Sequence, residues 1–76
     1  MPEIFSVCQF FDDDSYEYVR RHVSDEEAMK AAYFYTRNVS AKIGMTKRVI
    51  ITDGNDCIVF EWVYGKGIIF PAQETK

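Results

Sequence analysis

The stretch "SDEEAMKAAYFYTRNVSAKIG", residues 24–44, decides the fold, because only here do the apolar residues recur at helical spacing. Ser24 followed by Glu27 is a capping box, in which each side chain can bond a free backbone N–H of the first turn. Gly44 stands where helices commonly end in a left-handed residue. The pattern therefore predicts one helix over residues 25–43. Its apolar stripe consists of Ala28, Ala31, Ala32, Tyr35, Val39 and Ile43.

Strand-like sequence lies on both sides of this helix. β-Branched and aromatic residues are dense there, and Asp, Asn and Gly separate the segments, which is typical of strands joined by tight turns. The predicted strands cover residues 2–11, 16–23, 46–53, 57–64 and 68–71. Their order is β-β-α-β-β-β, an α+β fold in which one helix packs on one face of an antiparallel sheet of four to five strands. We expect one domain over residues 1–76, with 72–76 as a flexible tail.

The composition narrows the class of protein. The 76 residues carry a net charge of −3 and are 16% aromatic, so the chain has apolar surface to bury and no overall attraction to nucleic acid or anionic lipid. Two cysteines, Cys8 and Cys57, without C-x-x-C spacing favour a reducing compartment, although a disulfide between them stays open. The pattern of a secretory leader is absent, and no apolar run reaches the ~20 residues that cross a bilayer. We expect a cytoplasmic protein with no membrane partner.

Two acidic segments resemble metal loops. Asp53, Asn55 and Cys57 fall at the first three odd positions of a calcium loop, but Ile58 takes the place of its glycine and Tyr64 that of its bidentate glutamate. Residues 53–56 therefore indicate a hairpin turn of two or four residues, pairing Thr52 with Cys57. Neighbouring carboxylates in Asp12 to Ser15 point apart, so this run also predicts a turn. We predict no metal and no cofactor.

No catalytic set emerges from the pattern. His22 is the sole histidine. A four-residue first turn pairs Phe11 with Tyr16, which places Cys8 on the face opposite His22 and separates nucleophile from base. Glu61 stands alone in an apolar strand. The sequence therefore predicts a non-catalytic protein rather than an enzyme.

The two faces of the predicted sheet are both apolar. The predicted helix side holds Ile4, Cys8, Phe10, Val19, Val23, Val49, Ile51, Ile58, Phe60 and Trp62, with Phe70 if the last loop has three residues. The opposite face holds Phe5, Val7, Phe11, Tyr16, Tyr18, Ile50, Val59 and Val63. A solvated face would alternate to polar residues, and one helix covers only one side. We therefore predict an interaction or regulatory module that forms a homodimer through the second face. A sheet that curls over itself and a different protein partner are the alternatives.

Two further surfaces are candidates for binding. Tyr33 and Phe34 lie on the back of the helix and form a second contact patch. A single-stranded nucleic-acid binder that stacks bases on the sheet is the alternative function, since one predicted face mixes rings with cations. That set is Phe5, Tyr18, Arg20, His22 and Arg48. The net charge and the absence of an RNA-binding signature disfavour nucleic acid as the partner.

Overall fold

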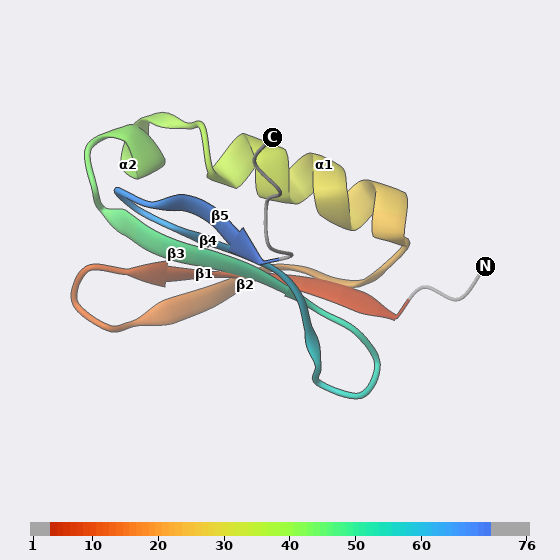
Figure 1. Ribbon diagram of the computed structural model, residues 1–76. Helices are drawn as coiled ribbons and strands as arrows, with labels where there is room; N and C mark the ends of the chain where they lie inside the picture. The colour runs from red at the N-terminus through yellow and green to blue at the C-terminus, as the bar shows by residue number, and fades with distance from the viewer. Residues whose placement is uncertain (1–3, 71–76) are drawn as a thin grey trace.

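The computed structural model describes residues 4–70, and the predicted tail at 72–76 lies outside this range. The elements follow in the order β1 (Phe5–Phe11), β2 (Tyr16–Val23), α1 (Asp25–Tyr35), α2 (Val39–Lys42), β3 (Thr46–Thr52), β4 (Ile58–Val63) and β5 (Gly67–Phe70). The strands form one antiparallel sheet in the order β2-β1-β3-β4-β5, and α1 lies across one face of it (Figure 1). The predicted α+β fold is confirmed.

The helix begins as predicted but ends early. The Ser24 hydroxyl accepts the Glu27 backbone N–H at 3.2 Å. The prediction of one helix over 25–43 is wrong, because α1 stops at Tyr35 and a separate turn, α2, begins after Asn38. The Asn38 side chain accepts the Ala41 N–H at 2.9 Å, so it caps a new helix instead of continuing the old one. Gly44, with φ +87°, closes α2 in the left-handed conformation expected of it.

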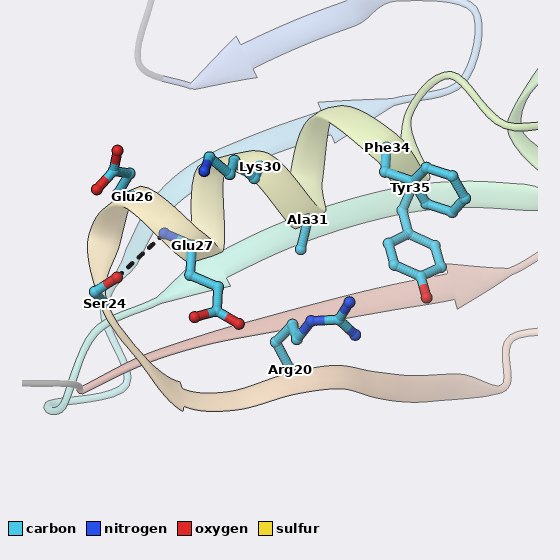
Figure 2. A pocket seen from close by; sticks show the side chains of 8 residues that line it. All are labelled: Arg20, Ser24, Glu26, Glu27, Lys30, Ala31, Phe34 and Tyr35. Carbon is cyan, nitrogen blue, oxygen red and sulfur yellow. Dashed lines mark hydrogen bonds between the residues drawn. The ribbon is translucent and has the colours of Figure 1, made fainter.

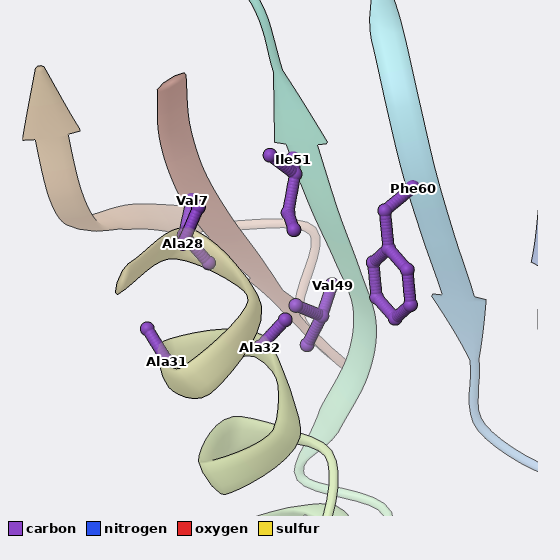
Figure 3. Close-up of a cluster of buried hydrophobic side chains, with 7 residues drawn as sticks. All are labelled: Val7, Ala28, Ala31, Ala32, Val49, Ile51 and Phe60. Atoms are coloured by element: carbon purple, nitrogen blue, oxygen red, sulfur yellow. The ribbon is translucent and has the colours of Figure 1, made fainter. Parts of the chain in front are cut away.

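The break removes two residues from the predicted apolar stripe. Val39 and Ile43 are 72% and 62% exposed, because α2 does not continue the helical phase of α1. The remaining stripe is three alanines and Tyr35, which packs against the core as predicted. The small alanine side chains let α1 approach the sheet closely. Figure 3 shows these alanines packed against β1, β3 and β4. The buried cluster consists of Val7, Ala28, Ala31, Ala32, Val49, Ile51 and Phe60.

The second hairpin, β3–β4, presents the predicted residues to the helix with one exception. Ile58 was predicted on the helix side, but it pairs with Thr52, which lies on the other face from Ile51, and it is 37% exposed. The observed pairs include Ile51 with Phe60 and Val49 with Trp62. Directly opposed residues share a face, so these four lie on the helix side as expected. The loop holds three residues, 54–56, because the Asp53 N–H bonds the Cys57 carbonyl at 3.0 Å. Thr52 therefore pairs with Ile58 and not with Cys57 as predicted. A bulge then leaves Val59 unpaired, and the total shift of two residues preserves the face.

The first hairpin, β1–β2, is where the prediction of faces is wrong. Its loop also has three residues, Asp12 to Asp14, because the Phe11 N–H bonds the Ser15 carbonyl at 2.8 Å. Cys8 therefore pairs with Tyr18, one residue away from the predicted register. A shift of one residue exchanges the two faces of a strand. The β1 residues under the helix are accordingly Phe5 and Val7 rather than Ile4, Cys8 and Phe10.

Two irregularities interrupt β2. Val7 pairs with Arg20 whereas Cys8 pairs with Tyr18, so Val19 is an extra residue in the ladder. A second shift lies nearer the end of the strand, where His22 takes φ +58°. Val19 and Val23 still pack against the core as predicted. The bulges therefore break the simple alternation of β2 without moving its valines out of the core.

The last strand also differs by one position. Its loop, Tyr64 to Lys66, has three residues, and Val63 pairs with Gly67. Trp62 pairs with Ile68 in the same register, and a shift beyond this pair then matches Glu61 with Phe70. Ile68, not Phe70, packs against the core.

Candidate functional site

The sheet face away from α1 is the candidate site, and we call it the open face. No described helix packs on this side of the sheet (Figure 1). Direct pairing links its members across all five strands. They are Cys8 and Phe10 of β1, Tyr16 and Tyr18 of β2, Arg48 and Ile50 of β3, Glu61 and Val63 of β4, and Phe70 of β5.

One ion pair lies near the middle of the open face. Arg48 Nε donates to Glu61 Oε2 at 2.6 Å, and the two side chains are 34% and 18% exposed. The Arg48 guanidinium also lies 5.1 Å from the Phe10 ring centroid. This arginine is therefore held from two sides, by a carboxylate on β4 and a ring on β1.

Aromatic rings continue from this pair to the outer strand. The Phe10 and Tyr16 centroids are 5.7 Å apart, and Tyr16 meets Tyr18 edge-on at 6.2 Å. Arg21 then stacks over Tyr18 at 4.7 Å. Offset and edge-to-face contacts of this kind are favourable beyond the area they bury. The result is one continuous row of contacts from β4 to β2.

Two residues of the open face next to this row are buried. Cys8 is 3% exposed and Ile50 is 9% exposed, although neither described helix packs on this side. Burial raises the pKa of the Cys8 thiol above its ordinary value, against the smaller lowering effects of a backbone hydrogen bond at Glu17 and the charge on Arg48. Cys8 is thus a packed thiol, whereas Cys57 is exposed, and both are free.

The predicted interface residues divide between the two faces. Tyr16, Tyr18, Ile50 and Val63 lie on the open face, as the pairing requires. Phe5 and Val7 do not, because both pack in the core beneath α1 and Val7 is fully buried.

Two members of the predicted interface occupy irregular positions. Phe11 pairs with Thr46 and follows Gln9 on the helix side. Val59 is the unpaired residue of the β4 bulge and is 37% exposed. The sequence reasoning missed Phe10 and the Arg48–Glu61 pair, which only the pairing of β1 with β3 brings together.

The predicted nucleic-acid set does not share one face. Tyr18 and Arg48 lie on the open face, but Phe5 packs under the helix. Arg20 lines a cleft beside α1, and His22 sits in the strained part of β2. The bulge at Val19 separates Arg20 from Tyr18, which simple alternation had placed together.

The acidic segments are turns, as predicted. Asp53 Oδ1 accepts the backbone N–H groups of Asn55 at 2.8 Å and Cys57 at 3.1 Å, so this carboxylate is used inside its own loop. Asp13 Oδ1 likewise accepts the Ser15 hydroxyl at 2.6 Å and the Ser15 N–H at 3.0 Å. These hydrogen bonds lower the pKa of the Asp13 carboxyl, and the bond from the Ser15 hydroxyl has the larger effect. Within residues 4–70, no three His, Cys, Asp or Glu side chains converge on a common point.

The predicted second patch is exposed on α1. Tyr33 and Phe34 are 47% and 61% exposed. Arg37 stacks over Tyr33 at 4.8 Å, and Phe34 meets Tyr35 edge-on at 5.0 Å. The two rings therefore have different neighbours, one a cation and the other a ring.

Comparison with protein-family models, with curated proteins and with solved structures finds no match to the chain. Over the part of the chain that the structure describes, neither helix is long and apolar enough to span a membrane.

Proposed function

We propose that the protein is a small non-catalytic interaction module of the cytoplasm that forms a homodimer through its open face. The row of rings and paired charges on an uncovered sheet carries this proposal. Tyr, Phe and Arg are the residues enriched at the centres of protein interfaces. The charged pair on this face is already satisfied within one chain, so a partner does not need to neutralise it.

A second copy fits this surface better than a partner of one charge sign. Arg48 and Glu61 are 2.6 Å apart, which leaves this part of the face close to neutral and compatible with its own image about a two-fold axis. Two antiparallel sheets commonly pack face to face about 10 Å apart.

The size of the face supports a modest interface. Five strands at ~4.8 Å spacing and about seven residues at ~3.3 Å each give roughly 500 Å² per copy. Two copies would then bury about 1,000 Å² in total, which is the lower end for a specific interface. We therefore expect a dissociation constant in the micromolar range rather than an obligate dimer.

Sedimentation velocity from 1 to 100 μM tests the proposal. The wild-type protein should shift from its monomer mass of 8.9 kDa toward twice that value as the concentration rises. Tyr18→Glu should remain monomeric, because it replaces an exposed ring of the row with a carboxylate that the dimer would have to bury. Tyr33→Glu is the matched control, since Tyr33 is also 47% exposed but lies on α1.

Two results would overturn the dimer. One is a wild-type protein that stays at 8.9 kDa up to 100 μM. The other is loss of the dimer in Tyr33→Glu with retention in Tyr18→Glu, which would place the interface on the helix instead.

We infer that single-stranded nucleic acid is not the partner of the open face. Arg48 is engaged by Glu61, and the net charge of −3 opposes approach to a polyanion. Gel retardation with a mixed oligonucleotide pool at low salt should show no shift. A shift that Arg48→Gln abolishes would contradict this inference.

A further inference from the structure

A cleft lies between α1 and the outer strand β2, away from the open face. Its volume is about 590 Å³, within the ~300–1,000 Å³ typical of small-molecule sites. Figure 2 shows Arg20 rising from β2 toward the underside of the helix. The cleft is lined by Arg20, Ser24, Glu26, Glu27, Lys30, Ala31, Phe34 and Tyr35.

Helical spacing explains the shape of the cleft. Glu27, Ala31 and Tyr35 follow each other at intervals of four and point toward β2 (Figure 2). Ala31 is the smallest of the three and is 6% exposed, so the cleft is deepest between Glu27 and Tyr35. A larger residue at this position would fill the space between the acid and the ring.

The chemistry changes along the cleft. Its N-terminal end carries the carboxylate of Glu27, its wall on β2 carries the Arg20 guanidinium, and its C-terminal end carries the rings of Phe34 and Tyr35. Arg20 Nη1 donates to the Val19 carbonyl at 2.7 Å, which holds the guanidinium in place. One of its five N–H donors is used there, so others remain to bind an anion.

The opposite charges in the cleft do not pair directly. Among the described residues, no carboxylate lies within 4.0 Å of the Arg20 guanidinium. A bound molecule that carries both charges can therefore contact both groups at once.

We propose that this cleft binds a zwitterionic α-amino acid with an aromatic side chain. The ligand's ammonium group contacts Glu27, its carboxylate forms a charge-assisted hydrogen bond with Arg20, and its ring packs against Phe34 and Tyr35. Lys30 also lines the cleft, so two cations and two carboxylates leave its lining close to neutral. An anion without an ammonium group is a poorer match, because it would leave the Glu27 carboxylate without a partner of opposite charge. A ligand without a ring would leave the aromatic end of the cleft empty.

Binding to the ¹⁵N-labelled protein, followed by backbone amide shifts, tests this proposal with L-phenylalanine as the probe. Saturable shifts should appear in α1 and the end of β2. N-acetyl-L-phenylalanine lacks the ammonium group, L-phenylalaninamide lacks the carboxylate, and L-alanine lacks the ring. Each should bind about tenfold more weakly or worse, as expected for the loss of one charged or aromatic contact.

Two variants locate the binding site. Arg20→Gln and Glu27→Gln should each weaken L-phenylalanine binding about tenfold, and the amide spectrum itself shows whether the fold is kept. Lys66→Gln, in the exposed loop between β4 and β5, is the control and should leave binding unchanged. Tyr18→Glu should also bind normally, which separates this inference from the proposed dimer. Absence of saturable shifts at 20 mM L-phenylalanine, or equal binding of the N-acetyl compound, would overturn the proposal.

Discussion

The hairpins β1–β2 and β3–β4 have loops of the same length and conformation, but they differ in which strand residues face the helix. Each loop has three residues, and its third residue is a left-handed aspartate: Asp14 with φ 71° and Asp56 with φ 61°. In β3–β4, a bulge at Val59 lies one pair from the loop, so Phe60 and Trp62 beyond it keep their predicted face. In β1–β2, the first bulge, at Val19, lies three pairs from the loop, so the one-residue change of register persists through Phe10 and Cys8 and β1 turns over. Irregularities beyond the loop, and not the loop alone, therefore decide which face a hairpin buries.

The largest expected effect comes from the strand that carries the core. Ile51→Ala in β3 should lower the free energy of unfolding by about 2–4 kcal/mol. The Ile51 side chain is 1% exposed, so shortening it leaves a cavity in the core. Val19→Ala in β2 should cost about 1 kcal/mol or less, since Val19 is only half-buried. Urea denaturation measures both. Equal losses would contradict the difference between the central and outer strands.

The left-handed aspartates should respond alike in the two hairpins. Asp14→Val and Asp56→Val should each destabilise the protein by about 1–2 kcal/mol, because a β-branched side chain clashes at positive φ. Asp14→Gly and Asp56→Gly should stay within about 0.5 kcal/mol of the wild type, since glycine adopts this conformation freely. A tolerated valine in only one loop, read from the thermal midpoint, would show that the two loops are not equivalent.

The carboxylate of Asp53 should contribute a smaller amount. Asp53→Ala removes the acceptor for the N–H groups of Asn55 and Cys57, at an expected cost of about 1 kcal/mol. Asn55→Ala, in the same loop, should change the free energy of unfolding by less than about 0.5 kcal/mol. A loss as large for Asn55 as for Asp53 in chemical denaturation would argue against the carboxylate's role.

The smallest effect should come from Asp13 and should depend on pH. Bonds from Ser15, chiefly its hydroxyl, lower the pKa of this carboxyl in the folded state. The stability it adds is therefore complete above the ordinary aspartate pKa of ~3.9 and is lost as the pH falls through the lowered value. The difference between wild type and Asp13→Asn should vanish across that window. A difference that stays constant from pH 7 down to pH 2 would refute the assignment.

The start of the helix and its alanine stripe could be predicted because local signals control them. Ser24 and Glu27 form their cap from within four residues of chain. The end of the helix could not be predicted from apolar spacing, since Val39 and Ile43 keep the helical interval although they are exposed. Asn38 was the available signal, because its short polar side chain favours a new cap over a helix interior.

The candidate site depends on a contact that no local pattern contains. Phe10 meets Arg48 only because β1 pairs with β3, and these residues are far apart in the sequence. The prediction from hydrophobic alternation assigned the face of β1 from its pairing with β2 alone. Strand order and bulge positions arise from the packing of the whole sheet. The sequence could therefore predict that one sheet face stays uncovered by the helix, but it could not predict which side of β1 lies on that face.

The bulges of β2 have a consequence for how copies of this chain can accumulate. A regular strand at the margin of a sheet is a template to which further chains add without limit, as in fibrils. Here that margin is interrupted at Val19 and again near His22, and the opposite margin, β5, has four residues within the described part of the chain. Contact through a flat surface with two-fold symmetry ends at two molecules. The irregular margin therefore protects a chain rich in aromatic strands from open-ended polymerisation.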